Sequence, residues 1–146
     1  MQKHKGFTLV ELVVVVMILG ILAAVAAPKL LGTSSAAAEN GLKQTLAVVR
    51  DAIERYAAEN AGQLPGTGDT TGDDLKSDLT KYLRGTFPVC PVGLQDATIR
   101  VVGGGVNITG VADPEHSWAY CTGTGQFICN SLEESETEPG ITYDTW

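Results

Sequence analysis

The hydrophobic pattern of the chain is most distinctive near its start. From Phe7 to Ala27 the residues are almost all apolar, and Glu11 is the only charged one. At about 1.5 Å per residue, a helix over this stretch is roughly 32 Å long, which is enough to cross the hydrocarbon core of a bilayer. We therefore predict a transmembrane helix with one carboxylate, a group that is costly in lipid and needs a partner.

A different pattern follows over residues 42–61, where apolar side chains recur at steps of three and four. The positions are Leu42, Leu46, Val49, Ile53 and Tyr56 or Ala57. This spacing predicts an amphipathic helix with one face packed on a hydrophobic core. Gly62 and Pro65 mark the end of that helix.

The last third of the chain has the short β-branched runs that are typical of strands. Runs at 98–102 and 106–109 surround three glycines, and runs at 117–121 and 126–130 surround a turn at 122–125. Each pair predicts a β-hairpin. In the connecting region before them, a short helix capped by Asp73 or Asp74 is expected.

These elements predict an α+β fold in which a long N-terminal helix crosses the membrane with its first half and packs its second half on a small antiparallel β-sheet. The expected division is a basic leader at 1–6, a transmembrane helix at 7–31 and an amphipathic helix half at 32–62. A connecting loop with a short helix occupies 63–97, and the sheet with an acidic tail occupies 98–146.

Two ordinary interpretations of the apolar run leave Glu11 unexplained. A secretory signal sequence has the same basic start and apolar core, and Ala24-Val25-Ala26 fits its cleavage site. A charge inside such a core weakens insertion, however. A plain single-pass anchor accounts for the length but gives the carboxylate no role. In either case Lys3 and Lys5 would hold the short end in the cytoplasm.

The sequence Gly6-Phe7-Thr8-Leu9-Val10-Glu11-Leu12, followed by the apolar run, resembles the N-terminal processing motif of type IV pilins and type II secretion pseudopilins. The resemblance implies that a prepilin peptidase cuts between Gly6 and Phe7 and methylates the new N-terminus at Phe7. It also implies that residues 7–31 form the filament core. Glu11 matches the acidic position that pairs with the N-terminal ammonium of a neighbouring subunit, which would make its burial tolerable.

The resemblance extends to the C-terminal third, where a proline loop, a tryptophan-x-tyrosine strand and a threonine-glycine turn are similar to those of pseudopilins: Pro88, Pro91, Gly93, Trp118, Tyr120, Thr124 and Gly125. The aspartate-rich calcium loop of the typical major pseudopilin is not recognisable. The acidic run from Glu133 to Glu138 is interpreted as a solvated tail. No metal site or cofactor is therefore predicted, and calcium binding is left open.

Three cysteines in an exported domain predict one disulfide and one spare thiol. If 122–125 is a turn, Cys129 shares the strand face of Phe127, whereas Cys121 lies on the opposite face, so a bridge within the hairpin is disfavoured. The preferred pairing is Cys90 with Cys121, and the alternative is Cys90 with Cys129. Three buried thiols are also compatible with the sequence.

The composition favours a structural protein over an enzyme or a nucleic-acid-binding protein. Removing Lys3 and Lys5 from the ten basic residues leaves eight against 17 acidic ones, a net charge of −9. Such a chain lacks the Lys and Arg clusters that bind phosphates, so direct contact with nucleic acid is not expected. Without the leader His116 is the only histidine, and no residues are arranged as a nucleophile with its base.

The resemblance implies a structural subunit of a type II secretion pseudopilus, first held in membrane lipid and then polymerised through its N-terminal helix. Its implied partners are copies of itself, minor pseudopilins, the prepilin peptidase, and an inner-membrane assembly platform with a cytoplasmic ATPase. The anchor would be single-pass in a bacterial inner membrane, with the C-terminal domain in the periplasm or outside. The alternatives are a type IV or competence pilin for adhesion, motility or DNA uptake, and an anchored binding module that does not polymerise.

Overall fold

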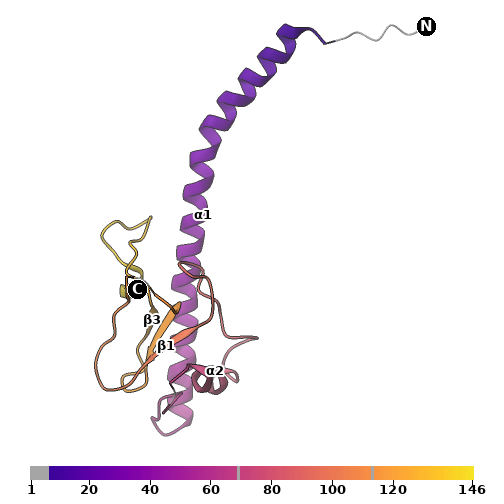
Figure 1. Cartoon of the computed structure of the whole chain (residues 1–146). Coiled ribbons are helices and arrows are strands. Elements are labelled where there is room, and N and C mark those ends of the chain that lie inside the picture. Colours follow the sequence, from indigo (N-terminus) through magenta and orange to yellow (C-terminus); the bar gives the residue numbers. More distant parts are fainter. Residues whose placement is uncertain (1–6, 69, 113) are drawn as a thin grey trace, which may run out of the picture. The chain divides into compact units, whose positions relative to one another are not determined.

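The computed structural model describes residues 7–68, 70–112 and 114–146. Its elements are helix α1 (Leu9–Glu59), helix α2 (Asp73–Leu79), strands β1 (Ile99–Val102), β2 (Trp118–Cys121) and β3 (Phe127–Cys129), and the 3-10 helix η1 (Tyr143–Thr145) (Figure 1). The chain divides after Ser35 into two compact units, and residues of α1 belong to both. The α+β class predicted from the sequence is confirmed.

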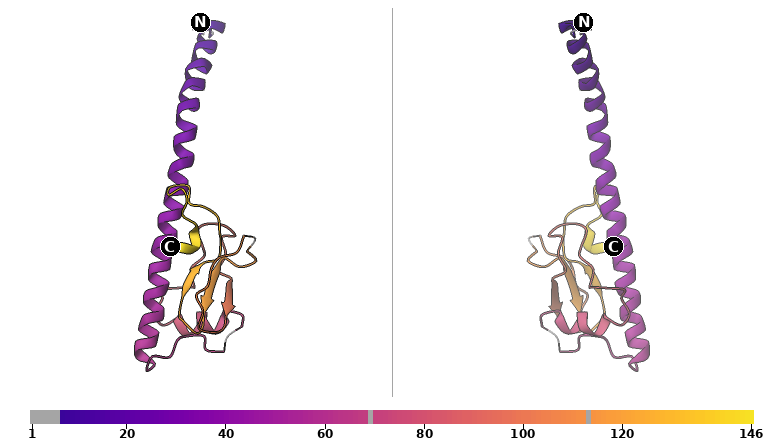
Figure 2. Two further views of the ribbon diagram at one scale, coloured as in Figure 1. Left: turned by 90° about the vertical axis from the view of Figure 1, so that its left-hand side faces the viewer. Right: turned by 90° about the vertical axis from the view of Figure 1, so that its right-hand side faces the viewer.

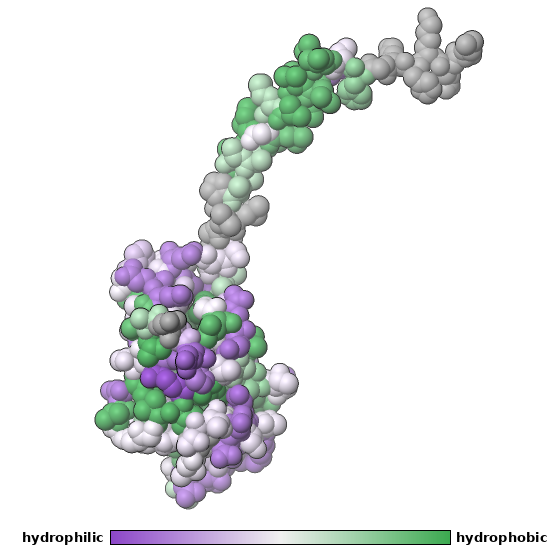
Figure 3. Space-filling model, viewed as in Figure 1, coloured by the Kyte–Doolittle hydropathy of each residue, from purple (hydrophilic) through white to green (hydrophobic). Residues whose placement is uncertain are grey.

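In the first unit, the segment Leu9–Ala27 of α1 is long and apolar enough to cross a membrane, with a mean hydropathy of 2.9. None of its residues is buried within the chain. Figure 3 shows the apolar side chains, in green, gathered over this segment. A helix with apolar residues on every side is stable only when lipid or other helices cover it.

In the second unit, the remaining half of α1 buries one face in the main hydrophobic core. Leu42, Leu46, Val49 and Ile53 are at most 3% exposed, which confirms the predicted amphipathic pattern. The β-sheet lies beside this half of the helix (Figure 2). The helix ends near Gly62, whose N–H donates to the carbonyl of Ala57 at 2.8 Å.

The sheet has three strands in the order β1-β2-β3, and it is mixed rather than antiparallel. Strands β2 and β3 form the predicted hairpin, with Tyr120 opposite Phe127. Strand β1, in contrast, pairs with β2 in parallel, so the hairpin predicted around the three glycines is wrong. The connection from β1 to β2 is long enough to return the chain to the start of a parallel neighbour. Ile108 lies in this connection and has no strand partner in the described part of the chain. Its N–H and carbonyl instead bond the side-chain amide of Gln126, at 2.7 and 3.2 Å.

Strand β2 is buried on both faces and separates two hydrophobic clusters. Trp118 and Tyr120 belong to the main core with α1, whereas Ala119 and Cys121 belong to a smaller cluster with Ile128. The polar ends of the two aromatic residues bond connecting loops, since Trp118 Nε1 donates to the carbonyl of residue 88 and Tyr120 Oη to that of residue 65. The central strand therefore fixes the loops as well as the core.

Helix α2 begins after Gly72, which has φ of 85° and provides no side-chain cap. The expected capping by Asp73 or Asp74 is therefore wrong, because both residues lie inside the helix. A Cβ atom placed on Gly72 would lie 2.7 Å from Cβ of Ile99 in the core. The position requires glycine both for its backbone angle and for its close contact.

We expect Gly72→Ala to lower the free energy of unfolding by about 3 kcal/mol, from left-handed strain plus overpacking. Gly68→Ala is the matched control, because Gly68 also has a positive φ of 88° but no described atom within 4 Å of the added Cβ. The control should lose only about 1 kcal/mol. Denaturant unfolding of the full chain in detergent measures both values, and equal losses would contradict the packing argument.

Candidate functional site

The first candidate site is the start of α1, where Thr8 and Glu11 bond each other reciprocally. The carboxylate of Glu11 accepts from the N–H of Thr8 at 2.9 Å and from its hydroxyl at 2.8 Å. The hydroxyl of Thr8 in turn accepts from the N–H of Glu11 at 3.2 Å. This is a capping box, with Thr8 as N-cap residue and Glu11 three residues later.

The capping box gives Glu11 a local role that the sequence analysis missed, although Thr8-Leu9-Val10-Glu11 carries its signature. Both bonds from Thr8 go to Oε2, and Oε1 of Glu11 has no hydrogen bond among the described residues. The side chain of Phe7, directly before the box, is 84% exposed. The predicted leader at 1–6, including Gly6, lies outside the described part of the chain.

The second candidate site is a buried carboxylate, that of Glu39, in the half of α1 that belongs to the second unit. The side chain is only 2% exposed. It accepts from the hydroxyls of Ser135, Thr137 and Tyr143 and from the N–H groups of Glu136 and Thr137, with the contacts to Ser135 and Glu136 at 2.9 and 2.6 Å. A buried charge is stable when so many donors replace water.

These donors also determine the electrostatics of Glu39. Burial raises the pKa of the carboxyl, but the bonds from Thr137, Ser135 and the N–H of Glu136 together outweigh it and lower the pKa below its ordinary value. The charged form is therefore the one that the folded state favours. Burial, and after it the nearby negative charge of Glu39, raises the pKa of Tyr143 to about 12.

The donors belong to residues 131–146, which we name the C-terminal segment. The acidic run predicts a solvated tail, whereas the structure bonds part of this segment to Glu39 of α1. The glutamate side chains are exposed, but Ser135 is buried and Glu134 forms a β-bridge with Thr142. The segment is therefore bonded to α1 through the carboxylate of Glu39.

Two further residues of α1, Lys43 and Arg50, bind the C-terminal segment. Lys43 forms an ion pair with Glu138, and its ammonium lies 4.2 Å from the ring centroid of Trp146. Arg50 donates from Nε to the carbonyl of Phe127 at 3.0 Å and from Nη2 to the backbone oxygen of Trp146 at 2.5 Å. Charged residues at 39, 43 and 50 therefore form a polar row along the edge of the apolar face.

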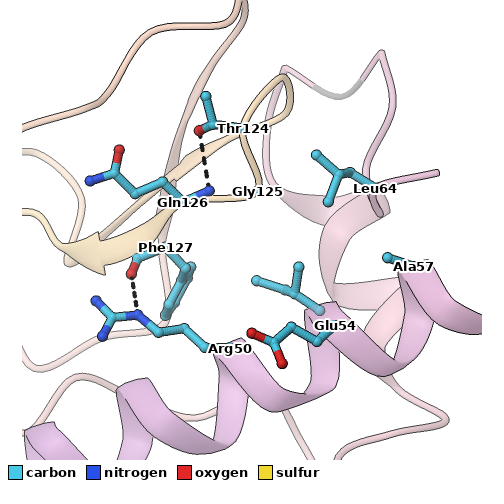
Figure 4. A pocket seen from close by; sticks show the side chains of 9 residues that line it. Arg50, Glu54, Ala57, Leu64, Thr124, Gly125, Gln126 and Phe127 are labelled. Carbon is cyan, nitrogen blue, oxygen red and sulfur yellow. Dashed lines mark hydrogen bonds between the residues drawn. The ribbon is translucent and has the colours of Figure 1, made fainter. Parts of the chain in front are cut away.

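Arg50 also lies at one side of a pocket of about 340 Å³ between α1 and the β2–β3 turn. Figure 4 shows its guanidinium directed at Phe127, with Glu54, Leu64 and Gln126 on the other sides. Burial lowers the pKa of Arg50, but a guanidinium remains charged at neutral pH. Because its Nε and Nη2 groups donate to the backbone oxygens of Phe127 and Trp146, Arg50 has a structural role within the second unit.

Replacing Arg50 with Ala should therefore cost about 2 kcal/mol of stability, since two charge-assisted bonds to backbone oxygens are lost. Arg55→Ala is the matched control on the same helix, because Arg55 forms only an exposed i,i+4 pair with Asp51. The control should lose less than about 0.5 kcal/mol. Hydrogen exchange at residues 143–146 tests the mechanism, and unchanged protection in Arg50→Ala would contradict it.

The three cysteines occupy two different places. The sulfurs of Cys90 and Cys129 lie 3.8 Å apart in the main core. Cys121 lies in the smaller cluster, where its sulfur is 3.1 and 3.4 Å from the carbonyl oxygens of Gly104 and Val106, which share its single S–H donor. As the alternation along the hairpin predicted, Cys121 and Cys129 face opposite sides of the sheet. The structure therefore brings Cys90 to Cys129 and does not bring the preferred pair, Cys90 and Cys121, together.

Comparison with known proteins points to one family. Residues 1–27 match the prokaryotic N-terminal methylation motif. The chain is 36% identical over 61 residues to the type II secretion system core protein G of Klebsiella pneumoniae, across 42% of this chain and 44% of that protein. It is 38% identical over 72 residues to the prepilin peptidase-dependent protein D of Escherichia coli, across 49% of each.

A third relative is the type IV narrow pilus major component of Thermus thermophilus, which is 44% identical over 51 residues, across 35% of this chain and 44% of that protein. The chain thus spans about half the length of the curated relatives that it matches. No solved structure gives a significant match. The chain therefore carries the prokaryotic N-terminal methylation motif at the start of an exposed apolar helix, and over about half of their length it is similar to type II secretion core proteins and type IV pilus components.

Proposed function

We propose that this chain is a structural subunit of a type II secretion pseudopilus. The observation that carries the proposal is the carboxylate of Glu11 in the first turn of α1, close to Phe7, at the start of the apolar segment Leu9–Ala27, none of whose residues is buried within the chain. Such a helix needs apolar partners, and its charge needs a cation. A neighbouring copy with a free N-terminal amine at Phe7 supplies both. The role is structural rather than catalytic.

Processing precedes assembly in this proposal. A prepilin peptidase cuts between Gly6 and Phe7 and methylates the amine of Phe7, as the match to the methylation motif supports. Before the cut, Lys3 and Lys5 hold the short end in the cytoplasm, and the apolar helix anchors the chain in lipid as a single pass. The C-terminal domain then lies on the periplasmic side of the inner membrane.

Assembly transfers the helix from lipid to a bundle of identical helices and minor pseudopilins. Removal of the leader creates a positive charge on the amine of Phe7, and Oε1 of Glu11 has free lone pairs to accept a hydrogen bond from this ammonium. An unpaired charge in an apolar bundle is strongly unfavourable. Subunits therefore pack well only when their stagger places Glu11 of one subunit next to the amine of Phe7 of its neighbour. The work of extrusion comes from a cytoplasmic ATPase acting through an inner-membrane platform, and the filament supports protein export.

Deleting the gene in the native host tests the proposed system. We expect proteins normally released into the medium to accumulate in the periplasm, while surface motility and DNA uptake are unchanged. Expression of the intact chain from a plasmid should restore release. The relatives include a type IV pilus component, so the opposite result, lost motility or uptake with normal release, would assign the chain to a pilus instead.

A further inference from the structure

The pair formed by Cys90 and Cys129 is a second chemical feature that the assembly role does not use. Cys90 lies in the proline loop before β1, and Cys129 is the last residue of β3. Both are at most 1% exposed, and they are 39 positions apart in the chain. The fold therefore brings two thiols from distant segments into direct contact inside the main core.

The surrounding contacts hold both sulfur-bearing residues in place. The N–H of Cys90 donates to the carbonyl of Asp96 at 2.8 Å, which closes the proline loop. Cys129 is fixed by its position opposite Trp118 in the sheet. A disulfide needs the sulfurs about 2.0 Å apart, and each sulfur moves on its own Cα–Cβ bond. Formation of the bridge therefore requires the two side chains to rotate until the 3.8 Å between the sulfurs is closed.

We infer that Cys90 and Cys129 form a disulfide when the domain folds outside the cytoplasm, and that Cys121 remains a thiol. The inference rests on the proposed function only in placing the domain in an oxidising compartment. Two S–H bonds break and one S–S bond forms. The S–S bond of an external disulfide, such as that of a thiol oxidoreductase, breaks in exchange through a mixed-disulfide intermediate. The two electrons pass to that oxidant, and its two sulfurs take up the two protons, directly or through solvent, to give its dithiol.

The position of each cysteine relative to the sheet determines which two of the three thiols can form the disulfide. Cys121 lies on the opposite face of β2, in a separate cluster, and its S–H is directed at the backbone carbonyls of Gly104 and Val106. A bridge from Cys121 to either partner would have to pass through the sheet. Because all three thiols are buried in the folded chain, oxidation takes place while the domain is still folding. The bridge then ties the proline loop to the strand that Arg50 contacts.

Counting thiols on the intact chain tests the inference. Full-length protein is extracted from native membranes with detergent, denatured, and alkylated with N-ethylmaleimide with or without prior reduction. We expect one adduct without reduction, on Cys121, and three after it. Three adducts without reduction, or a bridge that contains Cys121 in the peptide map, would overturn the inference. The same spectrum gives the N-terminal residue, so a failure of processing is recognised separately.

Two variants make the test independent of the wild-type count. Cys121→Ser should retain the bridge and take up no adduct before reduction, whereas Cys129→Ser should take up two, on Cys90 and Cys121. If Cys129→Ser instead forms a bridge between the remaining thiols and keeps the wild-type melting temperature, the assignment is wrong. The reduced wild-type chain should melt about 10–20 °C below the oxidised one, as expected for opening a loop of this length.

Discussion

Glu11→Gln is expected to abolish filament assembly while the chain stays anchored in the membrane. Glutamine keeps an oxygen that can accept the N–H of Thr8, so the capping box survives in part. It removes the negative charge, however, and leaves the amine of the neighbouring Phe7 unpaired in an apolar bundle. Breaking a buried ion pair from one side costs about 3–5 kcal/mol, which is more than 100-fold in subunit affinity.

Thr8→Ala separates the two roles of Glu11. It removes the hydroxyl that caps α1 but keeps the carboxylate, and loss of a cap costs only about 1 kcal/mol. We expect Thr8→Ala to assemble and Glu11→Gln to remain as membrane-embedded monomers, measured as the pelleted fraction after shearing filaments from the cell envelope. If both variants fail equally, Glu11 acts through the cap. If Glu11→Gln assembles normally, the charge is not needed.

The second large effect is expected at Glu39, where Ala should lower the free energy of unfolding by about 3–5 kcal/mol. The substitution deletes the acceptor for five donors of the C-terminal segment and leaves those that stay buried without a partner. Glu54→Ala, an exposed glutamate on the same helix, should change the stability by less than about 0.5 kcal/mol. Equal effects would show that the C-terminal segment is held by other contacts.

The pKa of Glu39 adds a pH dependence with a definite sign. Because the folded state lowers this pKa below that of the unfolded chain, the carboxylate stabilises the protein fully above the unfolded pKa of about 4.3. That contribution is lost as the pH falls through the lower, folded pKa. Glu39→Gln should therefore be less stable than wild type at pH 7, and the difference should shrink below pH 4. A difference that grows with acidity would contradict the assignment.

The sequence predicted the parts of the fold that depend on local pattern. The three- and four-residue spacing from Leu42 to Ile53 predicted the buried face of α1, and the turn at 122–125 predicted the β2–β3 hairpin together with the opposite faces of Cys121 and Cys129. These features are set by residues close together in the chain. Strand alternation and helical periodicity are sufficient to predict them.

The features that the sequence analysis missed depend on contacts between distant segments. The parallel pairing of β1 with β2 depends on the path of the residues between them, where Ile108 bonds the amide of Gln126 from beyond β2. Glu39 meets its partners more than 90 positions away, and periodicity says nothing about which polar residues on α1 are buried. The capping box is the exception, since Thr8 and Glu11 have the required spacing and could have been recognised.

The mass of the N-terminal peptide from native membranes tests the central claim most directly, because polymerisation through Glu11 requires a free amine next to it. The account predicts a chain that begins at Phe7 with one methyl group on its nitrogen. A chain that still carries residues 1–6, or one cut near Ala27 at the far end of the apolar segment, would contradict the account and return the protein to the anchored or secreted class.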